Sequence, residues 1–276
     1  MVTAFNRWSG IARRTASLGL CLGLMGACIA PETAINRAKV VAALRDCGQT
    51  NAAACFFTNS PVALEAKPVT LPGRPYTFFP TARSLSFVDG AGREWRAPKA
   101  TLTDGASIPP VFVPIVGSPR TPEFANAAAM HDAYCGVGND RQLVYHAAPW
   151  QDVHRMFYDT LIVGGTDPIK AKIMFAAVWL GGPRWNPLDG KDDTRNVRVP
   201  ANIQADIMIE TKSFIEREKP EMPRLISYLE WQDKKMMWRS NGPGPKMRAQ
   251  QTSPNNPSPP DASQPATAPT VPAAGN

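Results

Sequence analysis

Residues 173–180 read Ile-Met-Phe-Ala-Ala-Val-Trp-Leu, an apolar run with no polar face. The run lies between a helix start signal at Asp167-Pro168 and a helix stop signal at Gly181-Gly182. A helix that is apolar all round is stable in water only where other elements cover it on every side. We therefore expect a central helix over 169–180, enclosed by the rest of one domain.

Other segments supply elements that can enclose this helix. Residues 66–118 alternate aromatic or β-branched residues with polar ones, and Asp89-Gly90 marks a hairpin between two extended segments. Helix patterns occur at residues 32–46, 121–135, 149–164, 200–218 and 221–238. The fold class predicted is α+β, a small antiparallel sheet followed by a bundle of about five helices.

The first 27 residues have the composition of an export signal. Three arginines precede an uncharged apolar stretch, residues 16–27, which is too short for a stable spanning helix. The stretch leads into Leu24-Met25-Gly26-Ala27-Cys28, which resembles a bacterial lipobox. We expect Cys28 to be lipidated and to hold the protein on a membrane, as an outer-membrane or periplasmic lipoprotein. Simple secretion, with cleavage after Ala30, is the alternative.

The last 36 residues differ from the rest in composition. Residues 241–276 contain nine of the 28 prolines, with many Ala, Ser, Asn and Gln, and predict a disordered tail. The expected organisation is a signal peptide (1–27), a helical segment (28–65), one α+β domain (66–240) and this tail. The net charge is +7 over the chain but only +3 over residues 28–240, without a basic cluster, so no nucleic-acid partner is expected.

Cysteine spacing agrees with export. Cys47 and Cys55 are separated by a turn-rich interval, so a disulfide between them is easy to form and suits an oxidising periplasm. Cys135 has no evident partner in the sequence, and we expect it to be a buried free thiol.

All three histidines, His131, His146 and His154, lie within 24 residues. His131, next to Asp132, and His154 fall on apolar stripes of two adjacent predicted helices, so their rings are expected to meet in a dry interface. Buried imidazoles must satisfy one another's hydrogen bonds or they cost several kcal/mol. His131, Asp132 and His154 are therefore the candidate catalytic residues, and a structural hydrogen-bond network is the alternative.

Four segments carry a resemblance to a known family. They are residues 103–109 (Thr-Asp-Gly-Ala-Ser-Ile-Pro), 127–134, 155–161 and 171–178. Over about residues 70–185 the chain resembles domain of unknown function family 1353 of phages and bacteria. The motif residues are Asp104, Gly105, Ser107, Pro109 and Tyr134, beside His131 and Asp132. Family members usually carry Asp in place of His154, and an aromatic residue in place of Cys135.

A weaker similarity is to the His-Asp site of secreted phospholipase A2. It implies His131 as the base for water and Asp132 as a calcium ligand; His154 stands in the place of the orienting carboxylate, and Asp152 is close to it in sequence. A rival metal site uses His131, Asp132, His154 and Asp104, a donor set suited to zinc. A divalent metal, zinc or calcium, is thus an expected cofactor only under these two hypotheses.

Three functions remain open from sequence. The first is an exported envelope lipoprotein of unknown biochemical function, with a buried His/Asp/His cluster. The second is an envelope hydrolase, phospholipase-like or metal-dependent, that uses His131 and Asp132. The third is a phage-derived assembly or binding module. An open pocket that reaches the His131 ring favours chemistry, whereas a fully buried ring with both nitrogens paired favours a structural role.

Overall fold

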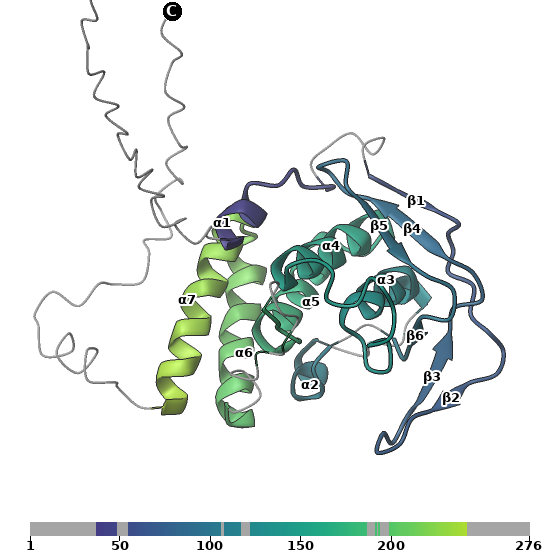
Figure 1. The fold of residues 1–276 in the computed structure, drawn as a ribbon. Coiled ribbons are helices and arrows are strands. Elements are labelled where there is room, and N and C mark those ends of the chain that lie inside the picture. The colour runs from purple at the N-terminus through teal and green to yellow at the C-terminus, as the bar shows by residue number, and fades with distance from the viewer. Residues whose placement is uncertain are drawn as a thin grey trace, which may run out of the picture. The chain divides into compact units, whose positions relative to one another are not determined.

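The structure is a computed structural model (Figure 1). It describes residues 37–48, 55–105, 108–116, 122–186, 191, 193 and 199–241. The predicted signal peptide, Cys28, Ser107 and the proline-rich tail beyond Asn241 lie outside the described residues. The described part has two small antiparallel sheets and a set of packed helices, and its fold class is α+β as predicted.

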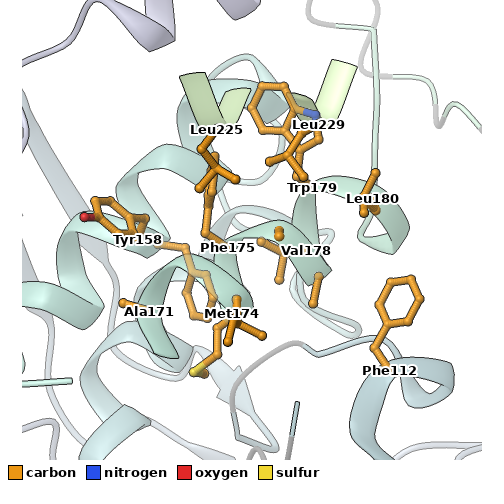
Figure 2. Packing of buried hydrophobic residues seen from close by; sticks show 14 of the residues in the cluster. Phe112, Tyr158, Ala171, Met174, Phe175, Val178, Trp179, Leu180, Leu225 and Leu229 are labelled. Carbon is orange, nitrogen blue, oxygen red and sulfur yellow. The ribbon is translucent and has the colours of Figure 1, made fainter. Parts of the chain in front are cut away.

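Helix α5 (Pro168–Gly181) is the predicted central helix. Its first turn is capped by Asp167, whose side chain accepts hydrogen bonds from the backbone N–H groups of Ile169 and Lys170. Every residue from 171 to 180 is buried. Figure 2 shows side chains of other elements packed around it, among them Tyr158, Leu225 and Leu229. The sequence prediction of a central, fully covered helix is confirmed.

The longer helices follow one another along the chain. They are α3 (Ala125–Cys135), α4 (Trp150–Val163), α6 (Ala201–Glu218) and α7 (Met222–Asn241). Each packs on the next in sequence, α3 on α4, α4 on α5, α5 on α6 and α6 on α7 (Figure 1). Shorter helical pieces are α1 (Arg37–Ala42), α2 (Val113–Val116) and the 3-10 turns η1 (Pro110–Phe112) and η2 (Pro122–Phe124).

Two helix boundaries differ from the predictions. Pro122 opens a 3-10 turn, and the α-helix begins after it at Ala125. Of the helix expected over 32–46, residues 32–36 lie outside the described part, and the helix α1 ends at Ala42. The backbone carbonyls of Val41 and Arg45 accept hydrogen bonds from the Arg155 guanidinium, so this side chain takes over part of the capping of α1.

The strands form two three-stranded sheets rather than the single sheet expected. One sheet has the order β1-β4-β5, from β1 (Phe56–Thr58), β4 (Leu85–Val88) and β5 (Glu94–Ala97). The other has the order β2-β3-β6, from β2 (Val69–Thr70), β3 (Thr77–Pro80) and β6 (Leu102–Thr103). The predicted hairpin is β4–β5, with Phe87 opposite Trp95 and both buried.

The turn between β4 and β5 touches the N-terminal segment through Gly90. A Cβ atom at this position would lie 2.4 Å from the backbone carbonyl oxygen of Arg45. Backbone atoms cannot move aside as a flexible side chain can. The absence of a side chain at Gly90 is therefore what allows this contact.

We expect Gly90→Ala to lower the free energy of unfolding by about 1–3 kcal/mol, because the added methyl group overpacks this contact. Urea denaturation measures the effect. The matched control is Ala91→Ser, at an exposed position of the same turn, with an expected change within about 0.5 kcal/mol. Equal losses in the two variants would show that the contact does not matter.

Candidate functional site

The structure brings His131 and His154 into direct contact. Nε2 of His131, on α3, lies 2.9 Å from Nδ1 of His154, on α4, which is hydrogen-bond distance. Neither residue has exposed surface. The Phe157 ring packs against His131, with ring centroids 4.9 Å apart. The pair thus lies in the interface between the two helices, as the apolar stripes predicted.

Burial keeps both imidazoles neutral. Loss of hydration lowers the pKa of His131 to about 3. The pKa of His154 is also well below its ordinary value, first because of burial and then because of the nearby His131 and Arg184. The backbone carbonyl of Pro183 acts in the opposite direction on His154. At neutral pH the pair is therefore a hydrogen bond between two uncharged rings, with a single proton between the facing nitrogens.

Cys135 lies one helical turn after His131 and contacts its ring. Its Sγ atom is 3.5 Å from Nε2 and 3.7 Å from Nδ1 of His131. Two nearly equal distances place the sulfur against the ring rather than in line with one nitrogen. Burial, followed by the negative charge of Asp132, raises the pKa of the thiol well above its usual range. Cys135 is a buried free thiol that stays protonated, not an activated nucleophile.

The two predicted carboxylates differ in burial. Asp132 is 3% exposed, and its backbone carbonyl accepts hydrogen bonds from Gly136 and from the Asn139 side chain. Asp104 is half-buried after β6. Among the described residues, which include His131, Asp132, His154 and Asp104, no three His, Cys, Asp or Glu are placed to hold a metal ion. The predicted four-residue donor set is therefore not assembled in this structure.

Asp152, which is close to His154 in sequence, forms an ion pair with Arg93. Its Oδ2 lies 2.8 Å from Nη1 of Arg93, and its side chain is fully buried. Arg93 also binds Asp89, whose other contacts include the indole N–H of Trp95. Asp152 thus fixes the β4–β5 hairpin to the first turn of α4.

The remaining motif residues have local structural roles. Gly105 has φ +116°, a conformation that residues with a side chain rarely adopt. Pro109 precedes the η1 turn. The hydroxyl of Tyr134 accepts a hydrogen bond from the backbone of Arg96, and its ring packs edge-on against Trp95. Tyr134 thus joins β5 to α3.

The third histidine, His146, is held apart from the pair. Its ring is stacked between Tyr145 and Trp185, with centroid distances of 4.0 and 4.1 Å. It has φ 54°, and its backbone N–H donates to the Tyr134 carbonyl. The stack packs the connection between α3 and α4 onto the chain that follows α5.

Sequence reasoning missed Asn139, which joins β6 to the end of α3. Its Oδ1 accepts from the backbone N–H of Leu102, and its Nδ2 donates to the carbonyls of Leu102 and Asp132. The side chain thus completes the backbone pairing of a strand only two residues long. An Asn three residues after a helix-ending glycine is too common a pattern to signal this role.

Sequence reasoning also missed a buried charged cluster on α4. Arg155 is 1% exposed; it forms an ion pair with Asp159 and donates to the carbonyls of Val41 and Arg45. The Tyr158 hydroxyl donates to Asp46. The pKa of Asp159 is raised to about 7, mainly by burial. The positive charge of Arg155 lowers this pKa and the negative charge of Asp46 raises it. Arg155 and Asp159 at i, i+4 on an otherwise buried helix were the available signal.

Comparison with known proteins finds a match in the middle of the chain. A family model described as "Protein of unknown function (DUF1353)" matches residues 81–178, which confirms the resemblance that the motifs predicted. The matched region contains His131, Asp132, His154 and the central part of the fold. The resemblance to phospholipase A2 is not shown by these comparisons.

Two curated proteins of Sinorhizobium fredii are similar to part of the chain. "Uncharacterized protein y4iH" is 46% identical over 104 residues, 38% of this chain and 40% of that protein. "Uncharacterized protein y4jT" is 35% identical over 111 residues, 40% of this chain and 31% of that protein. The chain thus spans less than half the length of both relatives. No solved structure shows significant similarity.

The hydrogen bond between the histidines predicts a coupling between their substitutions. We expect His131→Leu and His154→Leu each to lower the free energy of unfolding by about 1–3 kcal/mol, because each leaves a buried imidazole without its partner. The double variant should lose less than the sum of the two. Urea denaturation of the wild type, the two single variants and the double variant at pH 7.5 measures the coupling. If the losses in free energy of unfolding simply add, the hydrogen bond between the two rings does not stabilise the fold.

The lowered pKa of His131 also predicts how stability changes with pH. Below about pH 6.5 the histidines of the unfolded chain take up protons, whereas His131 in the folded protein stays neutral until the pH is close to 3. The folded state is therefore fully stable above about pH 6.5 and loses free energy of unfolding as the pH falls toward 3. For His131 alone the pKa shift corresponds to a loss on the order of 5 kcal/mol by pH 3. Denaturation at pH 7.5, 6 and 5 should show a smaller acid loss in the His131→Leu/His154→Leu protein than in the wild type.

Proposed function

We propose that the chain is an exported cell-envelope protein, held on a membrane by a lipid on Cys28, and that its family domain is a rigid module without a catalytic centre. The observation that carries the second part is the closed histidine pair. The His131 ring has no exposed surface, and its Nε2 is paired with His154. The low pKa of both rings opposes the proton uptake that a general base requires.

Export is supported by the sequence signal and by one structural feature. Cys47 and Cys55 form a disulfide bond in the structure, and both residues are buried. Such bonds persist in oxidising compartments and are rare in the cytosol. Among the described helices, none is both long and apolar enough to cross a membrane. A lipid on Cys28 supplies the membrane attachment in this proposal.

The export proposal predicts the state of each cysteine in the mature protein. We expect metabolic labelling with palmitate to mark the wild type and not Cys28→Ser, and membrane fractionation to release the variant into the soluble fraction. After denaturation without reductant, thiol titration should find one free thiol, Cys135, and after reduction three. An unlabelled wild type or three thiols without reductant would overturn the proposal.

Two measurements test whether the domain lacks a catalytic centre: the metal content of the purified protein and the stability of the His131→Ala variant. Elemental analysis of the purified protein should find no stoichiometric metal, and His131→Ala should keep the fold with a lower melting temperature. Stoichiometric zinc or calcium that is lost in His131→Ala, with the fold intact, would favour the hydrolase that uses His131 and Asp132. Histidine supplies nitrogen ligands that suit zinc, so zinc is the ion to examine first.

A further inference from the structure

Aromatic and basic side chains form a stripe along one side of helix α7. They occupy positions i, i+4, i+7, i+11 and i+14 of the helix, a spacing that brings them to the same side. All of them are half-buried, and they lie between the core side of α7 and the side that faces water. The stripe consists of Arg224, Tyr228, Trp231, Lys235 and Trp238.

The apolar surface of this stripe continues onto helix α6. The ring of Phe214, on α6, stacks on the ring of Tyr228, with centroids 3.8 Å apart. Glu210, also on α6, forms an ion pair with Lys235. The residue before it, Ile209, is 52% exposed, which is unusual for a large apolar side chain. We call the stripe together with Ile209 the α6–α7 face.

The basic side chains of the α6–α7 face lie over aromatic rings. The Lys235 ammonium is 5.0 Å from the ring centre of Trp231, and the Arg224 guanidinium is 5.3 Å from that of Phe214. A long basic side chain in this position covers apolar surface with its hydrocarbon stem and keeps its charged end in water. Trp and Tyr with Lys and Arg are the residue types that gather at the boundary between lipid and water.

The charges of the face are largely balanced. Lys235 is paired with Glu210, and Arg224 is paired with Glu218 of α6. A balanced face is attracted only weakly to anionic surfaces such as nucleic acid. The attraction that remains comes from the rings and from Ile209, and it does not depend on the charge of the lipid.

The N-terminal segment keeps this face close to the proposed lipid. Helix α1 packs on α7 (Figure 1), and its first residue, Arg37, is nine residues after Cys28. Nine residues span at most about 30 Å. A helix is about 10–12 Å across, so a lipid within this reach of α1 can enter a bilayer that touches any side of α7. Such a short tether also holds the face at a high local concentration beside the bilayer.

We propose that the α6–α7 face is a membrane-contact surface, which lays the domain on the boundary between lipid and water. The inference rests on the proposed function, because the lipid on Cys28 supplies the proximity. Trp231, Trp238 and Ile209 enter the boundary region, and the charged ends of the basic side chains lie among the headgroups. The contact is weak without the lipid because the rings are half-buried, so Cys28→Ser still leaves the membrane on fractionation.

Tryptophan fluorescence of the full protein with vesicles tests the contact. Brominated phosphatidylcholine quenches tryptophans that reach the lipid, and plain phosphatidylcholine does not. Two of the six tryptophans outside the predicted signal peptide, Trp231 and Trp238, belong to the face. Emission on brominated vesicles should therefore be lower by up to about one third. In the Trp231→Phe/Trp238→Phe protein this difference should disappear.

A matched pair of variants keeps both tryptophans and changes only exposed apolar side chains. Ile209→Glu places a charge in the boundary region and should reduce the quenching at least about twofold. Leu143→Glu is the control, since Leu143 is 99% exposed on the connection between α3 and α4, outside the face. It should leave the quenching unchanged. Thermal melting shows whether each variant keeps the fold.

The absence of quenching in the wild type, or equal quenching in the wild type and Ile209→Glu, would overturn the membrane contact. Quenching that needs anionic lipid and is lost in high salt would also overturn it, because the rings do not require charge. A dimer in solution without quenching would give the face to a second copy of the chain. Palmitate labelling without quenching would leave the lipid anchor and overturn the contact, whereas quenching without labelling would leave the contact and overturn the anchor.

Discussion

Helix α5 has no polar side, and its burial on every side determines where the other elements lie. Helices α4, α6 and α7 and the η1 turn all contribute side chains to the core around it. A second apolar cluster, between α3 and the β1-β4-β5 sheet, includes Phe87 and Trp95. Helix α4 lies between the two clusters and contributes to both, so its polar residues are buried along with its apolar ones.

Polar residues on α4 are directed to three different neighbours. Asp152 binds Arg93 of the hairpin, His154 binds His131 of α3, and Arg155 binds carbonyls within and just after α1. Residues this close in sequence point in different directions because each helical position is rotated by about 100°. The three contacts fix the hairpin, α3 and the N-terminal segment relative to one helix. These polar groups therefore specify the arrangement of elements that the apolar core alone would leave less defined.

The sequence predicted the helices well because their boundaries carry strong local signals. Asp167-Pro168 and Gly136 mark helix ends through capping and backbone conformation, which depend on a few adjacent residues. The meeting of His131 with His154 also followed from helical periodicity. The second sheet and the Arg155 cluster were missed because they depend on contacts between distant segments, such as Arg155 with Val41. Periodicity places a residue on a face but does not identify which distant carbonyl it will meet.

The carbonyl oxygen of Arg45 has a consequence for the limits of the domain. It accepts a hydrogen bond from Arg155 and lies against Gly90, so three segments distant in sequence meet at one atom. The family match covers residues 81–178 and includes two of the three. A polypeptide confined to that match would leave the Arg155 charge without its backbone acceptors and α5 without α6 and α7. The matched region is therefore smaller than the set of elements that covers α5 in this chain.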